Sequence, residues 1–290
     1  MSLAFFGTSE FGAAVLRSLV ERGRVEVSTV VSQPDRASGR GRRSGSPPVA
    51  EAARELGIPL EQPEDASAAP PAAQAGIVVA FGQILRDPLL TAYPLYNLHP
   101  SRLPRWRGAA PVERAIMAGD AETAVAVIRL VAELDAGPVF GMRPIAIGEH
   151  DDAGAVRAAA LELGVPLLEQ AAAGGLEPEP QPSDGITYAH KLTPQDRLLD
   201  WSRPAAELDR QVRALSPHIG ARTALDGKDL TVWSARPLET GPEPGTVAEP
   251  LVIGCGTGAL EVLELQPSGG RRMPAVDYLR GLRAPPQHAA

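Results

Sequence analysis

Apolar residues alternate along the chain between short runs and a helical spacing, which is the pattern of an α/β protein. Leu3 to Phe6 and Val25 to Val31 have the length and composition of strands. Between them, apolar side chains fall on one face of a predicted helix over 11–22. The pattern continues with predicted strands at 77–81, 123–130 and 138–147, and predicted helices at 49–56, 110–118 and 152–173. This order predicts a Rossmann-like, doubly wound and mostly parallel sheet.

Three stretches that contain Gly or Pro modify the predicted order of helices and strands. Residues 33–48 are rich in Gly, Arg, Ser and Pro and predict a long loop. The sequence Gly164-Val165-Pro166 predicts that the helix over 152–173 is interrupted or ends there. The proline-rich stretch 177–183 is typical of a spacer between domains.

Short strands follow the spacer and predict a second, smaller domain. After a predicted helix at 204–215, the apolar runs are separated by Gly and Pro, as in a small β-barrel. The runs are 222–225, 230–233, 245–248, 251–255 and 258–265. We therefore expect an α/β domain over 1–176, a linker over 177–203, a barrel over 204–284 and a frayed tail over 285–290.

Composition excludes several classes of protein. The chain has 290 residues, 44% of them hydrophobic, which is enough for a proper core. The single cysteine, Cys255, excludes a disulfide framework, suits a reducing cytoplasm and is expected to be a small buried side chain. There is no signal peptide and no apolar run of about 18 residues, so no membrane span is expected. No cluster of His, Cys and carboxylates predicts a metal, and no apolar stripe predicts an oligomer, so a monomer is expected.

The net charge and the local distribution of arginines lead to opposite predictions about nucleic-acid binding. The net charge is −7, which argues against binding a polyanion. Arginines nevertheless gather in three places, and such patches can bind phosphates. The patches are Arg36, Arg40, Arg42 and Arg43; Arg102, Arg105 and Arg107; and Arg271, Arg272, Arg280 and Arg283. Solvated surface charge explains the same pattern, so both interpretations stay open here.

Asn97 and His99 are the strongest candidates for chemistry. They follow a short apolar run and lie two apart, so in a strand they face the same side. An imidazole exchanges protons near neutral pH and an amide N–H can stabilise an oxyanion, as acyl-group transfer requires. Asp135, in a turn-like Leu-Asp-Ala-Gly, is a possible third partner. A structural histidine and an ordinary turn aspartate are the alternative interpretation.

Nucleotide-binding motifs are missing where this fold would carry them. The first turn, Gly7-Thr8-Ser9-Glu10-Phe11-Gly12, lacks the dinucleotide spacing, and the second strand ends without an acidic residue. No P-loop is present. Neither bound NAD nor ATP is therefore expected.

Several motifs together resemble the methionyl-tRNA formyltransferases, a branch of the folate-dependent formyltransferase family, over nearly the whole chain. The narrower ones are Gln33-Pro34-Asp35-Arg36 with Gly39-Arg40-Gly41, and Arg105-Trp106-Arg107-Gly108-Ala109-Ala110-Pro111. The broader ones are Asn97-Leu98-His99, Leu103-Pro104 and Leu134-Asp135-Ala136-Gly137. Further matches are Phe6-Gly7-Thr8, Val79-Ala80-Phe81-Gly82, Thr187-Tyr188-Ala189 with Lys191-Leu192, Asp200-Trp201 and Leu265-Gln266-Pro267.

The resemblance implies formyl transfer from 10-formyltetrahydrofolate, a co-substrate, to the amine of methionyl-initiator tRNA, with no metal. It implies Asn97, His99 and Asp135 as the catalytic residues. It also implies an OB-like C-terminal domain that binds tRNA. The implied folate-binding residues are Phe81, Gln83, Leu85, Ser101, Arg102, Leu103 and Pro104. The implied tRNA-binding residues are Arg36, Arg40, Arg42 and Arg43.

The sequence departs from the family pattern at two positions near the candidate site. Pro100 stands where glycine is commonest, and Arg102 replaces a usual apolar residue in the folate strip. Two other interpretations compete. A formyltransferase for an amino-sugar nucleotide would have no reason for the arginine loop, and a non-catalytic RNA-binding protein would not need the Asn, His and Asp set.

Overall fold

The structure, a computed structural model, describes residues 2–38 and 43–290 and divides into two compact units. The first unit takes residues 1–111, 123–146 and 157–190. The second takes residues 112–122, 147–156 and 191–290. Each unit is therefore built from three stretches of the chain, and the second unit includes two short stretches that precede residue 190.

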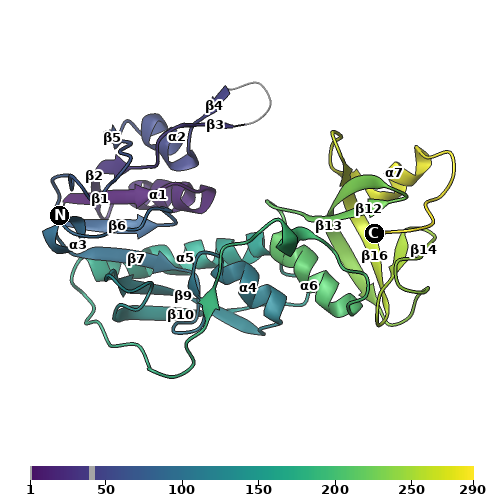
Figure 1. The fold of residues 1–290 in the computed structure, drawn as a ribbon. Helices are drawn as coiled ribbons and strands as arrows, with labels where there is room; N and C mark the ends of the chain where they lie inside the picture. The colour runs from purple at the N-terminus through teal and green to yellow at the C-terminus, as the bar shows by residue number, and fades with distance from the viewer. Residues whose placement is uncertain (1, 39–42) are drawn as a thin grey trace. The chain divides into compact units, whose positions relative to one another are not determined.

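A seven-stranded sheet forms the centre of the first unit (Figure 1). In spatial order its strands are β10 (Val139–Ala146), β9 (Glu122–Arg129), β7 (Leu95–His99), β6 (Ala75–Val79), β1 (Ser2–Gly7), β2 (Glu26–Val31) and β5 (Leu60–Glu61). The five strands from β7 to β5 are parallel, and β9 runs antiparallel to β7. The predicted Rossmann-like, mostly parallel sheet is confirmed.

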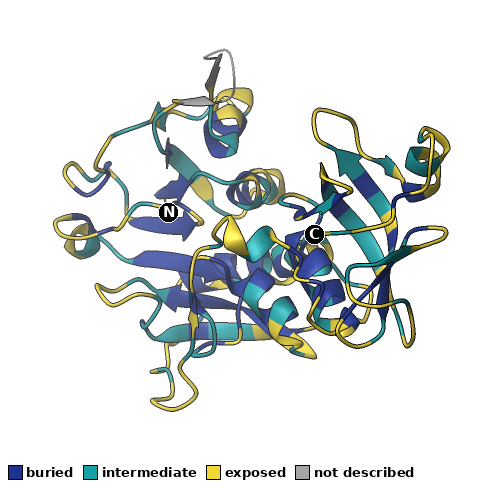
Figure 2. Ribbon diagram, turned by 45° about the vertical axis from the view of Figure 1, so that its right-hand side comes forward, coloured by how far each residue is buried: buried dark blue, intermediate teal, exposed yellow. Residues whose placement is uncertain are grey.

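The middle strands of this sheet are buried on both faces, as their continuous apolar runs predict. All residues of β6 and β7 are buried, and so is β1 after its first residue (Figure 2). Helices α1 (Glu10–Arg22) and α2 (Pro48–Glu55) pack against each other and against neighbouring strands. The short helix α3 (Leu89–Ala92) precedes β7. A buried sheet, packed against helices, thus supports the strand ends.

Helix α5 (Ala153–Ala172) continues through Pro166, so the predicted interruption at Gly164-Val165-Pro166 is wrong. Packing explains the difference. A Cβ atom on Gly164 would lie 2.8 Å from side-chain atoms of Leu98 and Val125, so glycine lets the helix approach the sheet closely. We infer that the apolar contact outweighs the helical hydrogen bond that proline removes.

The stretch 33–48 contains a short hairpin rather than only a loop. Strands β3 (Arg36–Ser38) and β4 (Arg43–Gly45) pair antiparallel, with Arg36 opposite Gly45. Backbone hydrogen bonds hold such a local pair without an apolar pattern, so no alternation of apolar residues predicts these strands.

The second unit contains an antiparallel sheet of six strands (Figure 1). The strands are β12 (Ala221–Leu225), β13 (Lys228–Leu238), β16 (Ala259–Pro267), β15 (Val252–Gly254), β14 (Val247–Ala248) and β17 (Met273–Pro274). The unit's helical segments are most of α4 (Pro111–Ala118), the 3-10 turn η1 (Gln195–Arg197), α6 (Ala205–Leu215) and α7 (Ala275–Arg280). The five predicted strands are present, and β17 is additional.

The last residues close this sheet into a barrel. The backbone N–H of Val247 donates to the carbonyl of Gln287 at 2.9 Å, and that of Ala289 donates to Gly245 at 2.8 Å. On the other side, Ala290 and Ala224 exchange two backbone hydrogen bonds of 2.9 and 3.0 Å. Residues 287–290 therefore join β12 to the chain at β14, and the predicted fraying is wrong for them.

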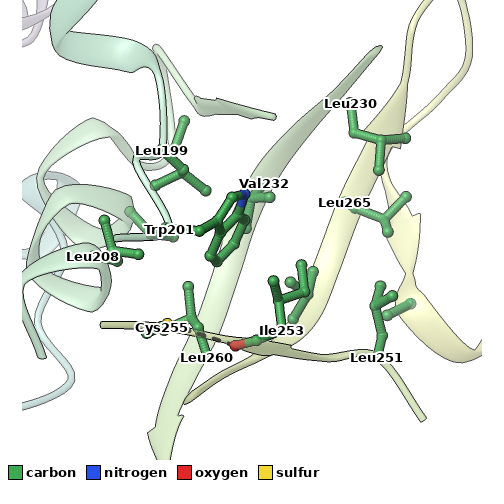
Figure 3. Packing of buried hydrophobic residues seen from close by; sticks show 14 of the residues in the cluster. Leu199, Trp201, Leu208, Leu230, Val232, Leu251, Ile253, Cys255, Leu260 and Leu265 are labelled. Carbon is green, nitrogen blue, oxygen red and sulfur yellow. Dashed lines mark hydrogen bonds between the residues drawn. The ribbon is translucent and has the colours of Figure 1, made fainter. Parts of the chain in front are cut away.

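Trp201 lies at the centre of the barrel core (Figure 3). Its indole N–H donates to the hydroxyl of Thr223 at 3.1 Å, so the buried polar atom is paired. Cys255 is buried in the same core, where its Sγ donates to the carbonyl of Ile253, and burial raises the pKa of the thiol to about 11. The expected structural role of this cysteine is confirmed.

No helix within the described residues is long and apolar enough to cross a lipid bilayer.

Candidate active site

The candidate site lies at the carboxyl edge of the parallel strands. Strand β1 pairs with β2 on one side and β6 on the other, so the strand order reverses beside β1. In open α/β sheets, ligands bind outside the carboxyl ends of strands at such a switch point. The stretch 80–85 follows β6, and Asn97 and His99 form the end of β7.

Asn97, His99 and Asp135 come together in the first unit. Asn97 and His99 are 8% and 5% exposed. The Asn97 amide donates to Oδ1 of Asp135 at 3.2 Å, and Nδ1 of His99 lies 3.7 Å from Oδ2 of the same carboxylate. The predicted common face of Asn97 and His99, and the predicted third partner, are thus close enough to act together.

The turn between β9 and β10 presents Asp135. Asp135 adopts a positive φ of 46°, a conformation that aspartate tolerates better than most residues. Gly137 is required in the same turn, because a Cβ atom there would lie 1.7 Å from the carbonyl oxygen of Arg129. Oδ2 of Asp135 also accepts the backbone N–H of Gly108 at 2.8 Å. The carboxylate is therefore oriented by a backbone group as well as by Asn97.

A backbone carbonyl fixes the orientation of His99. Its Nε2 lies 3.0 Å from the carbonyl oxygen of Trp106, so Nε2 carries a hydrogen and donates it. Nδ1 is then the ring atom that faces Asp135. An imidazole held in this way presents Nδ1 as the ring atom that can accept a proton.

The predicted folate residues of the 81–85 stretch have mixed surroundings. The Phe81 carbonyl accepts hydrogen bonds from the Thr8 hydroxyl at 2.6 Å and the Gln33 amide at 2.9 Å. The Gln83 side chain accepts from the backbone of residue 66 and donates to that of residue 63. Leu85 is buried in an apolar cluster with Phe81. These hydrogen bonds and apolar contacts hold the stretch in place.

The second predicted folate stretch, 101–104, follows β7. Ser101 is fully buried, and its hydroxyl has no hydrogen-bond partner among the described residues. A buried hydroxyl of this kind suits a polar ligand atom or water. Leu103 is 6% exposed and packs with Ala126 and Ile128. Arg102 is exposed and Pro104 is half-buried.

The structure describes the predicted tRNA residues only in part. Arg36 is exposed on β3. Arg40 and Arg42 lie outside the described residues, and so does the side chain of Arg43. At the base of the hairpin, hydrogen bonds from Gln62 and Ser46 to Asp35 hold the pKa of that carboxyl below its usual range.

Sequence reasoning missed the groups around the three candidate residues. The Trp106 carbonyl and the Gly108 N–H are backbone groups, which leave no side-chain pattern to recognise. Gln181 was also missed, because it lies in the stretch predicted to be a spacer. Its amide donates to the carbonyls of Asp135 and Gly137 at 2.7 and 2.8 Å. No group of three or more potential metal ligands is present among the described residues.

Known proteins of similar sequence define the family. Residues 1–172 match the model of the formyl transferase family, and residues 191–283 match its C-terminal domain. The chain is 43% identical to a methionyl-tRNA formyltransferase of Paracoccus denitrificans, with 98% of this chain and 99% of that one covered. The chain belongs to the methionyl-tRNA formyltransferase family.

Solved structures agree with this fold. The chain is similar to a methionyl-tRNA formyltransferase from Clostridium thermocellum, with a TM-score of 0.59 and 13% identity over 81% of this chain and 93% of that one. It is also similar to half of HypX from Aquifex aeolicus in complex with tetrahydrofolic acid, with a TM-score of 0.66 and 19% identity over 98% of this chain and 50% of that one. At these identities the likeness concerns the fold.

The candidate catalytic residues and the barrel lie in different matched regions. The formyl transferase region contains Asn97, His99 and Asp135, and the C-terminal region contains most of the barrel. Residues 173–190, which include Gln181, lie between the two matched regions.

Proposed function

We propose that this protein transfers the formyl group of 10-formyltetrahydrofolate to the α-amine of methionine on initiator tRNA. The convergence of Asn97 and His99 on Asp135 at the carboxyl edge of the sheet carries the proposal, since acyl transfer needs an oxyanion donor beside a proton carrier. Family membership along the whole chain supports the choice of the two substrates.

The reaction forms one C–N bond and breaks another. The neutral amine attacks the formyl carbon, and the carbonyl oxygen becomes a tetrahedral oxyanion. In the proposal, the second N–H of the Asn97 amide and His99 in its protonated form stabilise this oxyanion. The intermediate then expels the N10 atom of the folate, and the formyl group remains on the methionine.

The proton moves from the attacking amine to the folate nitrogen. Asp135 orients His99 and carries the proton between the two nitrogens through water in this proposal. The backbone N–H of Gly108 and the carbonyl of Trp106 fix the positions of the carboxylate and the ring. No group has to move far, because the proton donor and acceptor both bind to the same carbon.

The two folate stretches would bind the co-substrate along the same edge. We propose backbone groups near Gln83 and Leu85 for the pterin, together with Phe81. Ser101, Arg102, Leu103 and Pro104 would bind from the end of β7.

The remaining parts of the proposal concern the tRNA. Arg36, Arg40, Arg42 and Arg43 would bind phosphates near the acceptor end, because guanidinium groups pair well with phosphates. The C-terminal barrel would bind the tRNA backbone. We propose that the protein acts as a monomer, and in the cytoplasm, where initiator tRNA is charged and used.

The decisive experiment measures transfer of labelled formyl from 10-formyltetrahydrofolate to methionyl-initiator tRNA, with elongator methionyl-tRNA as the control. Transfer to the initiator alone supports the chemistry and the acceptor. Folate turnover without transfer to either tRNA would retain the chemistry but assign a small amine as acceptor. No turnover with any acceptor would contradict the proposal.

A further inference from the structure

Gln181 uses all the hydrogen-bonding capacity of its amide on groups around the candidate site. Its Nε2 donates to the carbonyls of Asp135 and Gly137 at 2.7 and 2.8 Å. Its Oε1 accepts from Nε and Nη2 of Arg107 at 3.2 and 2.9 Å. An amide has two donor hydrogens and two acceptor lone pairs, so the set is complete. Only the primary amides of Asn and Gln combine two donor hydrogens on one atom with two acceptor lone pairs on the other.

Arg107 links the Gln181 amide to the loop that contains Trp106 and Gly108. Its side chain is 5% exposed, and its Nη1 pairs with Glu133 at 3.1 Å. The next residue, Gly108, donates its backbone N–H to the Asp135 carboxylate. Gln181 therefore connects the turn that carries Asp135 with the loop that orients its carboxylate.

The rest of the segment 177–190 lies along the same two loops. Residues 139 and 179 exchange backbone hydrogen bonds of 2.7 and 2.9 Å beside the turn. Strand β11 (Tyr188–Ala189) pairs in parallel with β8 (Arg107–Gly108), and the Thr187 hydroxyl accepts the Trp106 backbone N–H at 2.9 Å. Thus the segment 177–190, which includes the predicted spacer, packs against both the Asp135–Gly137 turn and the Arg107 loop.

We propose that Gln181 is a positioning residue for Asp135, and that it acts by holding the Asp135–Gly137 turn against the Arg107 loop. Asp135 has a positive φ, which costs free energy unless its surroundings fix it. The two hydrogen bonds from Gln181 supply that constraint on both sides of Ala136. Without them, the carboxylate would no longer stay at one distance from Nδ1 of His99.

The proposal predicts a loss in turnover rather than in substrate binding. Gln181 forms its hydrogen bonds with protein groups alone, so its removal should leave the substrate contacts in place. A displacement of about 1 Å in a catalytic group lowers the rate by up to about a hundredfold. This inference rests on the proposed formyl transfer, so the unmodified protein must first be active.

Two variants test it in the full-length protein. Gln181→Met keeps the length of the side chain but removes all four hydrogen bonds, whereas Gln181→Glu keeps an acceptor for Arg107 and removes the donors to the turn. We expect both to lower kcat by about tenfold or more and to leave KM for folate and tRNA within about twofold. Gln170→Met, at an exposed position of α5, is the matched control and should match the unmodified protein.

A double-mutant cycle with Asp135 separates positioning from general stability. In an Asp135→Asn background, Gln181→Glu should change kcat less than about twofold, because the group it positions is already altered. Additive losses would overturn the proposal, as would unchanged kcat in Gln181→Glu. Urea unfolding of each variant checks that it is folded; if Gln181→Met unfolds, Gln181→Glu alone decides. Inactivity of the unmodified protein would instead count against the proposed function.

Discussion

The Nε2 atom of His99 donates to the carbonyl oxygen of Trp106 across 3.0 Å, and this leaves Nδ1 directed toward Asp135. A glutamine at position 99 can still donate an N–H but cannot become a cation beside the oxyanion. We expect His99→Gln to lower kcat by about a hundredfold or more. Formyl transfer at saturating folate and tRNA measures this loss; a decrease of tenfold or less would exclude His99 from stabilising the oxyanion.

Asn97 combines two tasks in the proposal, because its amide holds Asp135 and stabilises the oxyanion. The loss of one oxyanion donor costs about 2.7–4 kcal/mol in the transition state, so Asn97→Ala should lower turnover about a hundredfold or more. The thermal midpoint should show the variant folded. A loss of tenfold or less would remove Asn97 from the catalytic role.

Gly108 is confined by the strand beside it. Its φ is 120°, and a Cβ atom would lie 2.7 Å from the carbonyl oxygen of Ala189. Gly108→Ala should therefore separate β8 from β11, displace the N–H that Asp135 accepts, and destabilise the fold by about 1–3 kcal/mol. Urea unfolding measures the stability and kcat the activity. Gly174→Ala, also at positive φ but with nothing within 4 Å of its Cβ, isolates the backbone strain from the clash.

Asp196 should make the second unit sensitive to acid. Hydrogen bonding to Arg114, Nη1 to Oδ1 at 2.6 Å, is the largest cause that lowers the pKa of this carboxyl from 3.8 to about 2; Thr193 contributes through two further hydrogen bonds. Because the folded-state pKa is depressed, the stabilisation is complete above about pH 4. It is lost as the pH falls toward 2.

Asp196→Asn tests that dependence. We expect the variant to be less stable than the unmodified protein at neutral pH by on the order of 1 kcal/mol, with the difference becoming smaller as the pH falls from 4 toward 2. Urea midpoints at pH 7, 4 and 2.5 measure it. A constant difference across that range would show that the carboxylate charge contributes nothing.

The arginines at the β3–β4 hairpin should govern how salt affects the tRNA reaction. We expect Arg36→Ala and Arg43→Ala to raise KM for tRNA and to lower the slope of log affinity against log salt by about 0.7–0.9 for each phosphate contact removed. Turnover at saturating tRNA should change little. Arg24→Ala, an exposed position before the amino end of β2, is the control; equal effects there would mean that only net charge matters.

The sheet and the three central residues could be predicted because each depends on a local pattern. Apolar runs of strand length predict β1, β6 and β7, and a spacing of two puts Asn97 and His99 on one face. The local pattern predicts Asp135 as a turn residue and a possible third partner, and the resemblance adds it to the catalytic residues. Its contact with His99 depends on the pairing of β9 with β7, which no local sequence pattern predicts.

The features that could not be predicted depend on contacts between distant segments. The composition of 177–183 indicates a spacer, because proline-rich stretches rarely form regular elements, yet Gln181 reaches two carbonyls far away in sequence. The same reason explains residues 287–290, whose pairing with Ala224 and Gly245 leaves no periodic signal. Pro166 indicates a break in α5 only until the packing of Gly164 is known.

The pairing of β8 with β11 also has a consequence for making shorter versions of this protein. The formyl transferase match ends at residue 172, which invites expression of the first 172 residues as an isolated catalytic module. Such a fragment would lack Gln181 and the whole of β11, so Arg107 would lose its hydrogen bonds to Gln181 and β8 would lose the strand with which it pairs. During synthesis, likewise, the Asp135 turn acquires its final constraints only after residue 189 has left the ribosome.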